Sequence, residues 1–142
     1  MSLTARQTDL VQSTFHVVQP VAATAGQIFY KRLFEIDPTT ARLFRGGIEQ
    51  QAAKFMQVLA LAVSGLSNMP TLVPVVQQLG LRHAGYGVRP EQYDSVREAL
   101  LWMLALVLQD AYTEEVRSAW AEAYAMLAGI MMEASWDSPQ GR

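Results

Sequence analysis

The chain has 142 residues, of which 51% are hydrophobic and 17% are charged, and its formal net charge is −2. A chain of this length is expected to fold as one domain with a core large enough to hold a pocket. The small negative charge argues against nucleic acid as a partner. The absence of cysteine excludes disulfides, thiolate catalysis and zinc-finger spacing.

The N-terminal stretch MSLTARQTDL has neither the basic region nor the apolar run of a signal peptide. The longest apolar run, Ala99 to Leu108, is shorter than the roughly twenty residues that cross a bilayer. From these features we expect a cytoplasmic protein with no membrane span.

The first two segments of the chain are predicted to be helices, because apolar residues recur at helical spacing and no strand alternation is present. Thr4 and Gln7 form a plausible capping box at the start of the first helix. Pro20 marks the start of the second helix, which we expect to run to about Ile36.

One face of the second predicted helix carries Gly26, Tyr30 and Phe34, and this spacing aims a phenol at the core. A buried tyrosine needs a hydrogen-bond partner for its hydroxyl. Gly26 destabilises a helix by about 1 kcal/mol relative to alanine. A second helix that crosses close to Gly26 would explain the glycine.

The third predicted helix runs from about Ile48 to Leu66. Gln51 and Phe55 fall on its inward face, whereas Gln50 and Lys54 line up toward water. An inward glutamine is notable in a chain that is otherwise rich in apolar residues.

The fourth predicted helix has its start between Pro70 and Pro74 and ends at His83, which shares a face with Val76 and Leu79. This histidine is the one candidate metal ligand in the sequence. A histidine on an apolar face is more often a hydrogen-bonded core residue than a ligand, so both interpretations stand until other residues are considered.

Two further helices complete an all-α fold. Pro90 opens a long helix through Leu108, and Thr113 opens the last helix. We expect one domain over residues 1–136, followed by a short polar tail over residues 137–142.

Four strings of residues, in this order, carry a resemblance to a known family: IFYKRLFEIDP with Leu43 and Phe44 after it, EQQAAKFM, LGLRHAGYGV and AWAEAYAML. With them the chain resembles the globin family from Leu3 to about Ser135. More narrowly, it is similar to the single-domain bacterial globins, which are related to the globin part of flavohaemoglobins and to neuroglobin. The resemblance implies a three-over-three helical sandwich around a pocket for haem b, iron protoporphyrin IX.

The same resemblance implies roles for residues on the iron side of the pocket. His83 matches the proximal iron ligand, and the backbone carbonyl of Leu79 would hold its other ring N–H. Phe44 matches the phenylalanine that is wedged against the porphyrin. Phe55 and Val88 would contact the macrocycle from opposite sides.

On the distal side, Tyr30 matches the distal tyrosine of bacterial globins, and Gln51 stands where vertebrate globins usually have histidine. Both side chains would donate hydrogen bonds to oxygen, which takes on partial negative charge on ferrous iron. Lys54 would reach a haem propionate at the pocket mouth. Gly26 and Ala52 match the small residues at which two helices cross.

Two departures from the family pattern bear on function. The only histidine besides His83 is His16, on the first helix, so we expect no two-histidine coordination but an open or water-occupied sixth site, with tyrosine or glutamine ligation as the alternative. Flavohaemoglobins pair a proximal tyrosine with a glutamate. Here Tyr93 matches the tyrosine, but Ser135 holds the glutamate's position, and Glu133 lies about 200° away around the helix.

The residues taken singly also permit interpretations without a ligand. Tyr30 could be a core tyrosine bonded to a carbonyl, Gln51 a polar residue in a crevice, and Lys54 a solvated charge.

Taken together, the residues and the resemblance favour a haem-b protein that reversibly binds oxygen, nitric oxide or carbon monoxide for storage, delivery or sensing. The alternatives are an enzyme, a nitric oxide dioxygenase served by a separate reductase, and a haem-free helical sensor.

Overall fold

The computed structural model describes residues 3–43, 47–85 and 88–136, without the side chains of residues 43, 83–85 and 136. Within these ranges all regular structure is helical, which confirms the predicted all-α class. The helices are α1 (Ala5–Val18), η1 (Gln19–Val21), α2 (Ala22–Ile36), η2 (Pro38–Leu43), α3 (Ile48–Gly65), α4 (Met69–Gly85), α5 (Pro90–Leu108), η3 (Gln109–Ala111) and α6 (Glu114–Trp136), where η marks a 3-10 helix. The predicted polar tail, residues 137–142, lies outside the described residues.

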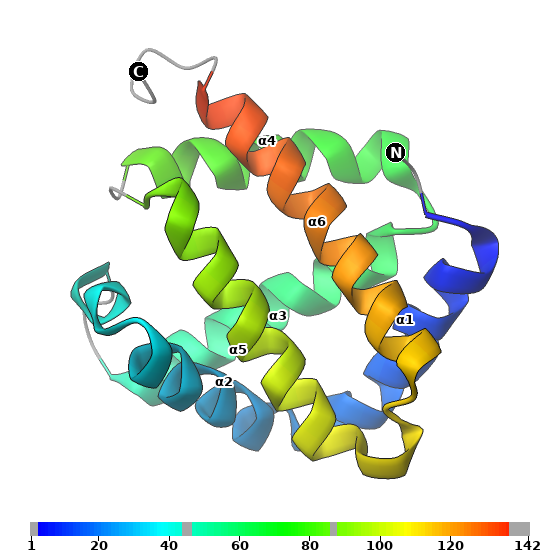
Figure 1. The fold of residues 1–142 in the computed structure, drawn as a ribbon. Coiled ribbons are helices and arrows are strands. Elements are labelled where there is room, and N and C mark those ends of the chain that lie inside the picture. The colour runs from blue at the N-terminus through cyan, green and yellow to red at the C-terminus, as the bar shows by residue number, and fades with distance from the viewer. Residues whose placement is uncertain (1–2, 44–46, 86–87, 137–142) are drawn as a thin grey trace.

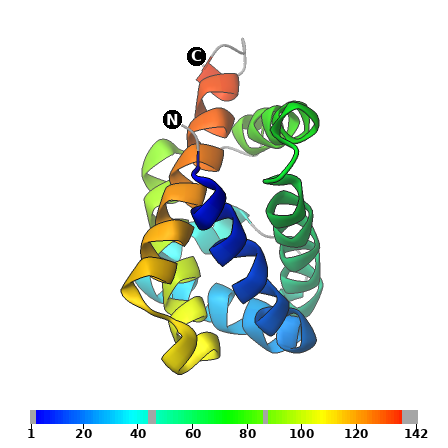
Figure 2. The ribbon, with the colours of Figure 1, turned by 90° about the vertical axis from the view of Figure 1, so that its right-hand side faces the viewer.

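The α-helices form two layers of three, with α1, α3 and α4 over α2, α5 and α6, as predicted. Figure 2 shows α3 and α4 on one side of the molecule and α5 and α6 on the other. Figure 1 shows α5 and α6 nearer the viewer, in front of α3. Between the layers α4 packs against α6 and α2 packs against α3, and within one layer α2 packs against α5. Over the described ranges, no helix is both long and apolar enough to cross a membrane.

Local signals place most helix starts where the sequence predicts them. The Thr4 hydroxyl accepts the Gln7 N–H and the Gln7 side chain accepts the Thr4 N–H, each at 3.0 Å, which confirms the capping box of α1. Pro90 is the first residue of α5. The Thr113 hydroxyl accepts the Val116 N–H at the start of α6, at 3.2 Å.

The start of α4 differs from the prediction. The helix begins at Met69, so Pro74 lies inside it rather than beside its first turn. A proline there removes the N–H that would bond to the carbonyl of Pro70. Both prolines are exposed, so water can satisfy this carbonyl and the helix continues.

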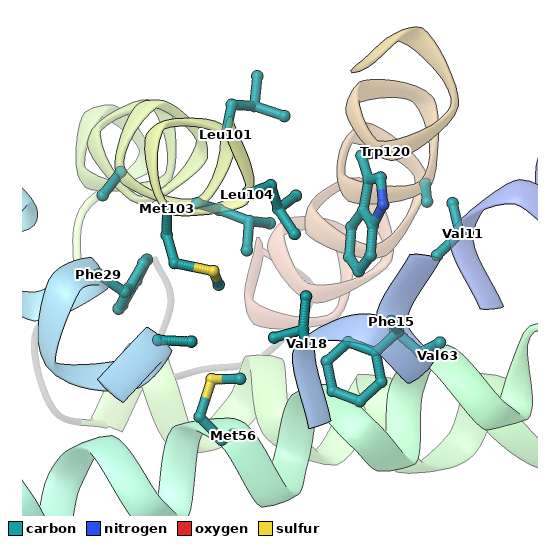
Figure 3. Packing of buried hydrophobic residues seen from close by; sticks show 14 of the residues in the cluster. Val11, Phe15, Val18, Phe29, Met56, Val63, Leu101, Met103, Leu104 and Trp120 are labelled. Atoms are coloured by element: carbon teal, nitrogen blue, oxygen red, sulfur yellow. The ribbon is translucent and has the colours of Figure 1, made fainter. Parts of the chain in front are cut away.

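An aromatic contact and a buried hydrogen bond join α1 to α6 in the core. Figure 3 shows Phe15 and Trp120 among the buried hydrophobic residues. The ring centroids of Phe15 and Trp120 lie 6.3 Å apart. The indole N–H of Trp120 donates to the Thr14 hydroxyl at 2.9 Å, and that hydroxyl in turn donates to the Leu10 carbonyl. The one polar atom of the tryptophan is thereby satisfied inside an apolar cluster.

Two glycines allow helices from different layers to approach closely. A Cβ on Gly26 would lie 2.8 Å from the Cβ of Ala52, which confirms the crossing predicted at this glycine. A Cβ on Gly80 of α4 would lie 2.6 Å from the Cα of Met131 in α6. Because these contacts fix how α3 meets α2 and how α4 meets α6, they also fix the space that is left between the layers.

Candidate functional site

A cavity of about 270 Å³ lies between the two layers, with walls from α2, α3, α4, α5 and α6 and from Val88 before α5. Its volume lies just below the range for small-molecule sites, about 300–1,000 Å³. Most of its lining side chains are apolar. The polar groups among them belong to Tyr30, Gln51, Lys54, Gln92, Tyr93 and Tyr124.

Tyr30 reaches the cavity from α2 and is only 4% exposed. Burial raises the pKa of its phenol to about 12, so the hydroxyl keeps its proton at neutral pH and can donate a hydrogen bond. Its ring lies edge-on to Phe29, with centroids 5.0 Å apart and planes at 75°, and edge-on to Phe55 at 5.9 Å. These two rings hold the phenol in one orientation.

The side chains of α3 that line the cavity range from half-buried to exposed. Gln51 and Phe55 are half-buried, and the Phe55 ring stacks on Phe29 with centroids 4.1 Å apart and planes at 4°. Lys54 is exposed and Val58 is 39% exposed, although both also line the cavity. The cavity therefore opens to solvent beside Lys54, where a cationic group would suit a carboxylate of a bound molecule.

Another part of the cavity wall comes from α4 and from the chain just before α5. Val76 and Leu79 of α4 line the cavity, as does Val88. His83 follows Leu79 by one turn in α4, but its side chain lies outside the described residues, and so does Phe44.

Each predicted site residue with a described side chain lines this one cavity, although these residues come from three helices and a connecting segment. They are Tyr30, Gln51, Lys54, Phe55, Leu79 and Val88. Apolar walls with a few hydrogen-bonding groups and a cation at the mouth fit a flat apolar group that carries carboxylates, as a porphyrin does. Among the described side chains, no cluster of three or more His, Cys, Asp or Glu could hold a metal ion.

Two polar residues of the cavity wall, Gln92 and Tyr124, are not among the predicted site residues. Gln92 is only 3% exposed and lines the cavity. Its place three residues after the N-cap of α5 is a typical capping position, and that signal could have identified it. Tyr124 also lines the cavity and donates a hydrogen bond to the Tyr93 carbonyl at 2.6 Å.

Tyr93 and Glu133 lie on the walls of different cavities. Tyr93 is 7% exposed and lines the cavity described above. Glu133 is exposed and lines a separate space of about 510 Å³ between α1, α6 and the α3–α4 corner. Ser135 donates to the Met132 carbonyl at 2.9 Å. Tyr93 and Glu133 thus line different cavities.

Comparisons with known proteins agree with the geometry. The Flavohemoprotein of Rhizobium meliloti (strain 1021) is 38% identical over 133 residues, which are 91% of this chain and 33% of that protein. The chain thus spans about a third of this relative. The Neuroglobin of Tetraodon nigroviridis is 29% identical over 143 residues, covering 91% of this chain and 90% of that protein.

A solved structure, that of a hexacoordinated heme protein from an anhydrobiotic tardigrade, matches with a TM-score of 0.84 over 93% of this chain and 94% of that one. At 20% sequence identity this likeness shows the fold alone. The globin family profile matches residues 27–131, which is most of the chain. The chain therefore belongs to the globin family, a family of haem proteins that bind gas ligands.

Proposed function

We propose that this globin holds haem b through His83 and reversibly binds oxygen, or nitric oxide or carbon monoxide, for storage, delivery or sensing. The observation that carries the proposal is that Tyr30, Gln51 and Leu79, from three different helices, all line one cavity. When bound, the haem would supply the iron at which the gas ligand is held.

Different residues of this chain would bind the iron and donate hydrogen bonds to the gas ligand. His83 would bind iron through Nε2, and its other ring nitrogen would donate to the Leu79 carbonyl, which fixes the tautomer. The Tyr30 hydroxyl and the Gln51 amide would donate to a ligand that carries partial negative charge. The stacked rings of Phe29 and Phe55 would keep water away from this part of the pocket.

The second histidine supports an open or water-occupied sixth site. His16 is exposed on α1, and it is absent from the side chains that line the cavity. The proposed sixth site thus differs from that of the tardigrade protein, which is described as hexacoordinated.

Absorption spectra of the purified protein in ferric, ferrous and carbonylated forms test this proposal. We expect a Soret band that shifts on reduction and again on carbon monoxide addition, with a ferrous spectrum that is not of the two-histidine type. A protein that remains colourless after haem is supplied would contradict the proposal, and a two-histidine ferrous spectrum would contradict the open site.

The similarity to flavohemoproteins favours a second candidate function, nitric oxide dioxygenase activity that takes electrons from a separate reductase. The placement of Tyr93 and Glu133 in different cavities weighs against it. Sustained consumption of nitric oxide with NADH and a reductase from the cell would support the enzyme. A single turnover without such sustained consumption would support the reversible binder.

A further inference from the structure

A chain of polar side chains joins η2 to the first turns of α5 beside the cavity. The Ser95 hydroxyl donates to one carboxylate oxygen of Asp37 at 2.8 Å, and the Thr39 hydroxyl donates to the other. The Gln92 amide donates to the Thr39 hydroxyl oxygen at 3.2 Å. We call these four residues, Asp37, Thr39, Gln92 and Ser95, the Asp37–Gln92 bridge.

Gln92 is the member of the bridge that reaches the cavity. Its side-chain oxygen accepts the N–H of Arg89 at 2.8 Å, so both ends of the amide are bonded although the residue is 3% exposed. Arg89 follows Val88 directly, and Val88 is itself part of the cavity wall. One buried side chain therefore fixes the backbone next to Val88 and, at its other end, contacts η2.

Asp37, the C-cap residue of α2 immediately before η2, anchors the bridge at the start of η2. The hydroxyls of Thr39 and Ser95 lower the pKa of its carboxyl group, so the group is charged at neutral pH and its hydrogen bonds are charge-assisted. The hydroxyl of Thr40, which is 1% exposed, donates to the Asp37 carbonyl at 2.6 Å. Hydrogen bonds thus hold both the side chain and the backbone carbonyl of Asp37. These bonds fix η2 against α5.

The two segments that the bridge joins both lead to residues assigned to the haem. η2 ends at Leu43, immediately before Phe44, and the other segment carries Val88. We propose that the Asp37–Gln92 bridge positions these two segments around the haem, and that Gln92 and Thr39 are therefore determinants of haem retention. This inference rests on the haem site of the proposed function.

Replacement of Thr39 tests the bridge, because Thr39 is exposed and does not line the cavity. Thr39→Val removes the hydroxyl between Gln92 and Asp37 at nearly constant volume. In the full-length holoprotein, we expect transfer of haem to an excess of a haem-binding acceptor protein to become roughly tenfold faster, since a buried amide loses its acceptor. Thr39→Ser restores the hydroxyl and should restore the slow transfer.

Thr113→Val is the matched control. Thr113 is also exposed, and its hydroxyl also accepts one hydrogen bond, from the Val116 N–H at the start of α6, away from the cavity. We expect it to leave haem transfer at the wild-type rate even if urea unfolding shows that it destabilises the apoprotein as much as Thr39→Val does. Equal transfer rates for Thr39→Val and Thr113→Val would overturn the inference.

Gln92→Ala provides a second, independent variant. It should speed haem transfer at least as much as Thr39→Val, and the double variant should be no faster than Gln92→Ala alone, because both changes break the same bridge. Additive effects would show that the two residues act separately. A wild-type protein that takes up no haem would defeat the proposed function itself, whereas a haem-binding protein that is insensitive to these changes would defeat only the bridge.

Discussion

At the scale of single residues, the phenol of Tyr30 has the properties that a distal hydrogen-bond donor needs. It is buried, it lines the cavity, and its raised pKa keeps it protonated at every physiological pH. The rings of Phe29 and Phe55 limit its rotation. A donor that is already oriented loses little entropy when it bonds to a ligand.

Tyr30→Phe is expected to speed oxygen dissociation about ten- to hundredfold, because one hydrogen bond to a partly charged ligand is lost. Stopped-flow replacement of oxygen by carbon monoxide measures this rate. Carbon monoxide carries less charge, so its own dissociation rate should change much less.

Tyr124→Phe is the control for this experiment. Tyr124 also lines the cavity, but its hydroxyl already donates to the Tyr93 carbonyl, so its loss should alter oxygen dissociation far less. An unchanged oxygen dissociation rate in Tyr30→Phe would show that this phenol does not contact the ligand.

The sequence predicts some of these residues well and others poorly. Helical spacing alone places Tyr30 and Gln51 on inward faces, and the structure puts both on the cavity wall. The capping position of Gln92 is a local signal, but its contact with Thr39, 53 residues earlier, is not encoded in any local pattern. Long-range partners of polar groups follow from the packed fold rather than from periodicity.

At the scale of helices, the backbone approach of α4 to α6 sets the position of the helix that carries His83. Gly80 lies three residues before His83, and Met131 faces it from α6. The sequence does not predict this contact, whereas it predicts the similar one between Gly26 and Ala52. The difference is that Gly26 belongs to a recognised pair of small residues, whereas Gly80 faces backbone atoms of a methionine.

Gly80→Ala is expected to destabilise the protein by about 1–3 kcal/mol, because the added methyl group overlaps the backbone of α6 and the two helices must move apart. Urea unfolding of the apoprotein measures the change in the free energy of unfolding. The substitution should also weaken haem retention, since α4 moves with His83 on it.

Gly129→Ala in α6 is the matched control, because a Cβ at Gly129 meets no atom within 4 Å. Here alanine should stabilise the helix by about 0.5–1 kcal/mol through its lower conformational entropy in the unfolded chain. Equal effects of the two substitutions would indicate that helix propensity, and not the contact with Met131, dominates at Gly80.

At the scale of the whole molecule, the order of helices and their layered arrangement followed from apolar periodicity, proline positions and the family resemblance. The interior position of Pro74 did not, because a proline inside a helix is tolerated here where both Pro70 and Pro74 are exposed to water. The cavity itself also depends on the fold, since its lining residues come from five helices and one connecting segment. Periodicity identifies inward faces but not the volume left between them.

The central claim is that His83 holds iron porphyrin in this cavity, and haem titration of the wild-type protein and of His83→Gly, with and without free imidazole, tests it most directly. We expect the wild type to bind haem with a strong Soret band, His83→Gly to bind it weakly, and added imidazole to restore the band by replacing the missing ring. A wild-type protein that takes up no haem, or a His83→Gly variant with the wild-type spectrum and affinity, would contradict the claim.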